Sequence, residues 1–80
     1  MKLQVLAFGI VKEIFGSSQI EVEMMDGNSV EALKMVLENQ YPRLKQLASY
    51  RIAINQQFAG PADALAHNDE IAVIPPVSGG

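Results

Sequence analysis

Residues 70–75 read EIAVIP, a short apolar run that ends in a proline. Residues 2–8, KLQVLAF, form a second such run, with apolar side chains on both faces toward its end. Runs that are apolar on both faces are typical of strands buried within a sheet. We therefore predict that these two segments pair with each other, in parallel, at the centre of one sheet.

Two further strands are predicted beside this central pair. Residues 18–25, SQIEVEMM, alternate apolar and polar side chains, so one face of this strand is solvated. Residues 9–16 begin and end with glycine and suit a turn or a single helical turn, which would make the first two strands an antiparallel hairpin. Residues 50–58, YRIAINQQF, alternate in a similar way and predict the third strand of the chain.

One main helix is predicted over residues 29–41. Asn28 or Ser29 can cap its first turn with a side-chain oxygen. Pro42 then stops this helix or starts a second short helical stretch over residues 42–49. Apolar residues recur at the spacing of one helix face, which indicates core packing. These positions are Val30, Leu33, Val36, Leu37 and Tyr41.

The order strand, strand, helix, strand, strand predicts an α+β fold of the β-grasp type. In this fold a mixed sheet of about four to five strands packs on the main helix. Residues 59–70 are expected to form a loop with a possible helical turn before the last strand. We expect one domain over residues 1–80, of which residues 75–80 form an extended, flexible C-terminal tail.

Composition excludes several classes of function. The chain has 80 residues, of which 49% are hydrophobic and 19% charged, so it should fold around one core. It has no cysteine, which excludes disulfides, cysteine-bound zinc and thiol nucleophiles. A net charge of -3 without a cluster of lysine and arginine makes nucleic acid an unfavourable partner. No run approaches the roughly 20 apolar residues that span a bilayer, so we expect no membrane partner and a cytoplasmic location.

Candidate catalytic residues are few. His67 is the sole histidine and lies beside Asn68 and Asp69, without the further ligands that a metal site requires. We interpret it as a solvated turn residue and predict no metal site. The serines lack an accompanying base in any recognisable motif, so nucleophilic serine catalysis is not expected.

The tail PPVSGG, residues 75–80, is the remaining feature that could carry chemistry. Pro75 and Pro76 cannot donate ladder hydrogen bonds and would form a stiff stalk. Gly79 and Gly80 have no Cβ, so this end could enter a channel too narrow for a side chain. A carboxylate presented in this way could be activated as an acyl-adenylate. The alternative is an inert glycine end or a cloning artefact.

The whole chain resembles the small, sulfur-carrier subunits of molybdopterin synthase, which are ubiquitin-like β-grasp proteins. The likeness lies in LQVLAFGIVKEIFG at residues 3–16, SVEALKMVL at residues 29–37 and IAINQQF at residues 52–58. Its most specific part is HNDEIAVIPPVSGG at residues 67–80, which is far more restrictive than two glycines alone.

The resemblance implies that Gly80 is adenylated by an E1-like activating enzyme that uses ATP, and is then converted to a thiocarboxylate. Its sulfur would go to cyclic pyranopterin monophosphate, precursor Z, in molybdenum cofactor biosynthesis. The chain itself would bind no cofactor and have no complete active site, so the question whether to call it an enzyme stays open. It would act as the donor subunit beside a large catalytic subunit, in a heterotetramer.

The resemblance also implies two sets of contact residues. The tail inserted into the large subunit would consist of Pro75, Pro76, Val77, Ser78 and Gly79. A hydrophobic docking surface for both partners would include Phe8, Phe58 and Ile74. From the residues alone, either phenylalanine could instead belong to the core, and an exposed patch would favour the interface.

Three other functions remain open. A sulfur carrier of the thiamine pathway would share the fold and the two glycines, although the proline pair favours the molybdopterin pathway. A ubiquitin-like protein modifier would join Gly80 to lysines of target proteins through an amide bond. A β-grasp interaction domain with an inert tail is the third.

Overall fold

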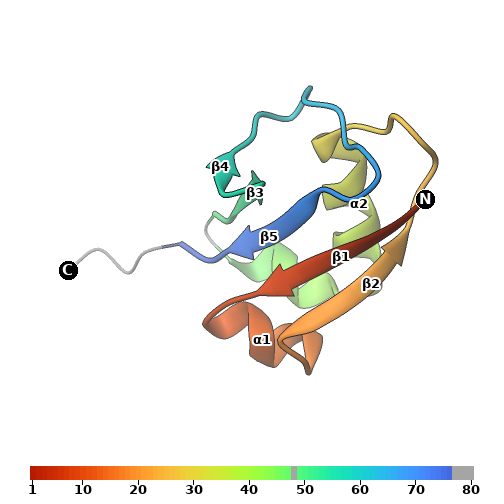
Figure 1. Ribbon diagram of the computed structural model, residues 1–80. Coiled ribbons are helices and arrows are strands. Elements are labelled where there is room, and N and C mark those ends of the chain that lie inside the picture. The colour runs from red at the N-terminus through yellow and green to blue at the C-terminus, as the bar shows by residue number, and fades with distance from the viewer. Residues whose placement is uncertain (48, 77–80) are drawn as a thin grey trace.

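A computed structural model describes residues 1–47 and 49–76 of the chain. Within these residues, five strands form one mixed sheet in the order β2-β1-β5-β3-β4, and helix α2 packs across one face of it (Figure 1). The elements are β1 (Lys2–Ala7), α1 (Ile10–Phe15), β2 (Gln19–Glu23), α2 (Val30–Gln40), the 3₁₀ helix η1 (Pro42–Gln46), β3 (Arg51–Ile54), β4 (Gln57–Phe58) and β5 (Glu70–Ile74).

The two apolar segments from opposite ends of the sequence lie side by side at the centre of the sheet. Strand β5 runs parallel to β1, with Val5 opposite Ile71, and antiparallel to β3 on its other edge. Strand β2 pairs antiparallel with β1, as the hairpin prediction requires. The predicted β-grasp arrangement, with a mixed sheet on one main helix, is confirmed.

The core lies between the sheet and α2. Alternate residues of the central strands point toward the helix, including Val5 and Ile71, which are fully buried. Leu33 and Leu37, one helical turn apart on α2, are buried against them. The hydroxyl oxygen of Ser29 accepts a hydrogen bond of 3.2 Å from the backbone N–H of Ala32, so Ser29 is the N-cap.

The segment between β1 and β2 is more regular than a turn. It forms the short helix α1, which buries Val11 and Phe15. Gly16 ends this helix in the left-handed conformation, with φ of 76°, and its N–H donates to the carbonyl of Lys12 at 2.8 Å. Residues 42–46 form a 3₁₀ helix, which confirms the predicted second helical stretch over a shorter range.

The prediction of one unbroken third strand over residues 50–58 is wrong. Asn55 and Gln56 have φ of 52° and 70°, so the chain reverses in a two-residue turn between β3 and β4. The Asn55 side chain fixes this turn, because its amide donates to Asp69 at 3.0 Å and its oxygen accepts from the backbone N–H of Glu70 at 2.9 Å. The alternation of apolar and polar residues does not reveal that Asn55 and Gln56 adopt the left-handed conformation.

The possible helical turn in residues 59–70 is also absent from the structure. This segment consists of turns and one isolated bridge between Ser29 and Ala64. Its backbone bonds to the start of α2 instead, since the N–H of Leu65 donates to Asn28 at 2.8 Å. The buried side chain of Leu65 anchors the loop to the core.

Candidate partner-docking site

The face of the sheet turned away from α2 carries a second apolar set of side chains. On β1 and β5 these are the residues between the core positions, since successive side chains of a strand point to opposite faces. Strand pairing places Leu6 opposite Ala72, Ala72 opposite Ala53, and Ala53 opposite Phe58. A row with two alanines between larger side chains leaves a depression over β5.

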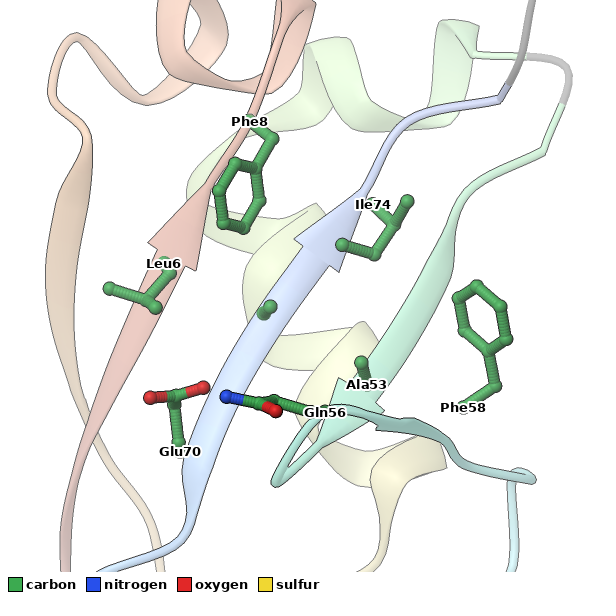
Figure 2. Close-up of a pocket in the computed structure, with 8 residues that line it drawn as sticks. Leu6, Phe8, Ala53, Gln56, Phe58, Glu70 and Ile74 are labelled. Carbon is green, nitrogen blue, oxygen red and sulfur yellow. The ribbon is translucent and has the colours of Figure 1, made fainter.

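This depression is a groove of about 330 Å³. Phe8 and Leu6 stand along its β1 side, Phe58 lies at the opposite edge, and the side chain of Ile74 lies between the two phenylalanines (Figure 2). The groove is lined by Leu6, Phe8, Ala53, Gln56, Phe58, Glu70, Ala72 and Ile74.

The two phenylalanines of the groove are exposed to solvent. Phe8 is 46% exposed and Phe58 is 57% exposed, whereas Ile74 is partly buried. An exposed aromatic pair beside a groove is more typical of an interaction surface than of a core. The three residues predicted to form the docking surface are therefore brought together on one face, although no contact with a partner is part of the structure.

Polar and charged side chains lie at both ends of the groove. Glu70 and Gln56 line one end (Figure 2). At the other end, Arg51 pairs in register with Ile74, and its guanidinium carbon lies 3.7 Å from the centroid of the Phe58 ring. This cation–π contact holds Phe58 against the edge of the groove.

The predicted tail begins at the Phe8 end of the groove. Pro75 and Pro76 follow Ile74 and are partly buried. Pro75 approaches Gly9 so closely that a Cβ on Gly9 would lie 3.2 Å from the Pro75 ring. The expectations for Val77, Ser78, Gly79 and Gly80 lie outside the described residues, so insertion of the tail and chemistry at Gly80 stay predictions.

Part of the groove was not predicted from the sequence. Leu6, Ala53 and Ala72 line it, yet each reads as an ordinary strand residue. Their shared face could have been inferred from strand alternation, but their side-by-side placement depends on register, which the sequence does not state. The turn residue Gln56 reaches the groove because β4 folds back onto β3.

Other candidate chemistry lies outside this groove. His67 is exposed in a turn, as predicted. Across residues 1–47 and 49–76, no group of three or more histidine, aspartate or glutamate side chains could hold a metal ion. In the same residues, no helix is long and apolar enough to cross a membrane. Burial, together with the hydrogen bond and charge of Glu38, raises the pKa of the Tyr50 hydroxyl, which does not line the groove.

The sheet order, the crossing helix and the apolar outer face define a ubiquitin-like β-grasp protein. A family model described as the ThiS family matches residues 5–80, and the chain belongs to this family. The resemblance to the sulfur-carrier subunits of molybdopterin synthase is confirmed by a relative from Mycobacterium tuberculosis named molybdopterin synthase sulfur carrier subunit. It is 38% identical, over 100% of this chain and 99% of that protein.

Solved structures show the same fold. SAMP1 from Haloferax volcanii superimposes with a TM-score of 0.85 at 25% identity, and the match covers 100% of both chains. A chain from the complex of subunits 1 and 2 of the molybdopterin-converting factor of Helicobacter pylori matches with a TM-score of 0.71, also at 25% identity and over 100% of both chains. In that structure the two subunits form a complex.

Proposed function

We propose that this protein is the sulfur-carrier subunit of a molybdopterin synthase. The observation that carries the proposal is the 38% identity to the Mycobacterium tuberculosis carrier subunit along the entire chain. The family match through residue 80 supports it, because it includes the segment PPVSGG. In this proposal Gly80 carries the free carboxylate of the mature protein.

The proposed chemistry takes place on that carboxylate. An E1-like enzyme transfers AMP from ATP to the Gly80 carboxylate and releases pyrophosphate, because a free carboxylate is a poor electrophile and an acyl-adenylate is a good one. Attack by a sulfur donor expels AMP and leaves a thiocarboxylate. The sulfur then goes to cyclic pyranopterin monophosphate within the large subunit. ATP therefore belongs to the activating enzyme and the pterin to the large subunit.

The groove supports a function in which this protein docks on partners that carry out the chemistry. An exposed apolar groove lined by Phe8, Phe58 and Ile74 offers a partner a large desolvation gain. The chain continues from Ile74 into Pro75 at the same end, so docking here would bring the tail to the partner. Pro75 and Pro76 lead into Val77, Ser78 and Gly79, which would enter the partner's channel.

Intact mass tests the chemistry directly. We expect co-expression with the activating enzyme and a sulfur source to exchange one oxygen for sulfur at Gly80. Deletion of Gly80 should abolish synthase activity and leave the thermal unfolding midpoint unchanged, because the described core lies within residues 3–73. A protein that is adenylated but never gains sulfur would contradict the proposal, as would full activity of the deleted form.

Phe8→Asp tests the docking surface. The substitution places a charge in a surface that the partner desolvates, so we expect the complex with the large subunit to weaken by at least about tenfold. Isothermal titration measures this, and Met35→Asp is the matched control, since Met35 is 68% exposed on α2 and does not line the groove. Equal affinities of the Phe8→Asp and Met35→Asp variants would show that Phe8 does not belong to the interface.

Two alternatives keep support from the comparisons. The match to SAMP1 favours a ubiquitin-like protein modifier, in which Gly80 forms an amide with lysines of other proteins. The ThiS family match is compatible with a thiamine-pathway carrier. Conjugates of higher mass in cell extracts would favour the modifier. Loss of thiamine synthesis, rather than of molybdenum cofactor, in a deletion strain would favour the thiamine carrier.

A further inference from the structure

The groove has a charge of opposite sign at each end. Glu70 lines one end, and Arg51 lies at the other, where it pairs in register with Ile74. Alternation along β5 and β3 places Glu70 on the face of Ala72, and Arg51 on the face of Ala53. Since Glu70 and Ile74 are four positions apart on β5, the backbones of Glu70 and Arg51 are about 13 Å apart along the strand direction. The guanidinium of Arg51 lies over Phe58 at the β4 edge of the groove.

The protein does not neutralise these charges itself within its described residues. The ion pairs found there join Met1 to Asp26 and Lys2 to Glu21, so Glu70 and Arg51 have no opposite charge within 4.0 Å. The guanidinium carbon of Arg51 lies 3.7 Å from the centroid of the Phe58 ring. The N–H edge of the guanidinium can still bind a carboxylate.

We propose that Glu70 and Arg51 set the orientation in which the large subunit docks on the groove, an inference that rests on the proposed function. The partner surface that fits has apolar side chains over Ala53 and Ala72, a lysine or arginine facing Glu70, and a carboxylate facing Arg51. An apolar centre with a charged rim is the usual anatomy of such interfaces. Docking in the reversed direction would bring like charges together, which disfavours it.

Orientation matters because the arginine end is also where the chain leaves the sheet. Ile74, opposite Arg51, is followed directly by Pro75, whose ring packs close to Gly9. A partner held in one orientation meets Pro75 on the same side in every complex. The charges would thus direct the tail toward one entrance, while the apolar groove supplies most of the affinity.

Charge reversal tests the proposal. We expect Glu70→Lys and Arg51→Glu each to weaken binding of the large subunit by about three- to tenfold at low salt. At about 0.5 M salt the loss should shrink, because screening reduces interactions between exposed charges. Glu70→Gln should lie between the native protein and Glu70→Lys. Isothermal titration at both salt concentrations gives these values, and circular dichroism checks folding.

Matched control variants separate the effect of a charge beside the groove from the effect of the protein's net charge on binding. Glu23→Lys, on the edge strand β2, and Arg43→Glu, in η1, change the net charge equally at exposed positions outside the groove. If Glu70→Lys and Arg51→Glu bind as tightly as these controls while Phe8→Asp binds weakly, the orientation proposal is overturned and docking on the groove stands. If the native protein does not bind the large subunit at all, both the proposed function and this inference are contradicted.

Discussion

Single residues in this protein owe their roles to register as much as to chemical type. Phe8 is exposed and Phe15 is buried, although both end apolar runs in the sequence. Phe15 packs within the core, with its ring centroid 4.6 Å from that of Tyr41, because α1 turns that side chain inward. Phe8 follows the last residue of β1 on the outer face. The same residue type therefore supports folding at one position and lines an exposed groove at the other.

Tyr50 provides a residue-scale prediction about pH. Tyr50 is 8% exposed, and this burial, together with the hydrogen bond from its hydroxyl to Glu38, raises its folded-state pKa above the usual value near 10. The unfolded chain loses this proton first as the pH rises. The stability that Tyr50 contributes is therefore complete below about pH 10 and is lost progressively above it.

Tyr50→Phe removes both the hydrogen bond and the titrating group. We expect the free energy of unfolding near pH 8 to fall by about 1 kcal/mol. From about pH 8 to about pH 10.5, the variant should lose less stability than the native protein. Urea unfolding at the two pH values measures both effects. Glu38→Gln should give an intermediate loss, because burial of Tyr50 remains, and equal losses in all three proteins would contradict this account.

At the scale of elements, long periodic segments were predictable and short irregular ones were not. The apolar spacing around Leu33 and Leu37 identifies α2, and alternation identifies β2. Prediction from the sequence failed at the break between β3 and β4, because the turn residues Asn55 and Gln56 include no glycine or proline that would mark it. It named Phe8, Phe58 and Ile74 through a family resemblance. It did not find the alanine floor of the groove, which arises from pairing between strands distant in sequence.

The turn between β3 and β4 yields an element-scale prediction. Gln56 has a side chain at φ of 70°, where glycine avoids the steric cost that other residues bear. We expect Gln56→Gly to raise the free energy of unfolding by about 0.5–1 kcal/mol, as measured by urea unfolding. Asn55→Gly is the contrasting variant. It should destabilise, because it removes the hydrogen bonds to Asp69 and to the backbone of Glu70; a gain in stability would contradict this role of Asn55.

At the scale of the whole molecule, the fold closes through its last strand. β5 pairs with β1 on one edge and with β3 on the other, so it joins the β1–β2 hairpin to the β3–β4 hairpin (Figure 1). Ile71 and Val73 place its inner face in the core. The sheet without β5 would be two separate hairpins, and an isolated hairpin is marginally stable at best.

Two truncations test this dependence. A chain cut after residue 69 lacks β5, and we expect it to be unfolded by circular dichroism. A chain cut after residue 76 keeps every described core residue, so its thermal midpoint should stay within about 2 °C of that of the full chain. Cooperative melting of the shorter form would show that the hairpins are stable without β5.

The central position of β5 also has a consequence for protein synthesis. A nascent chain of the first 69 residues lacks β5, the middle strand of the sheet, and with it Glu70, Ala72 and Ile74 of the groove. We therefore expect a nascent or prematurely ended chain to lack the docking groove. In the proposed function, only a polypeptide translated through β5 would dock on a partner, so the order of the strands would exclude unfinished chains from the complex.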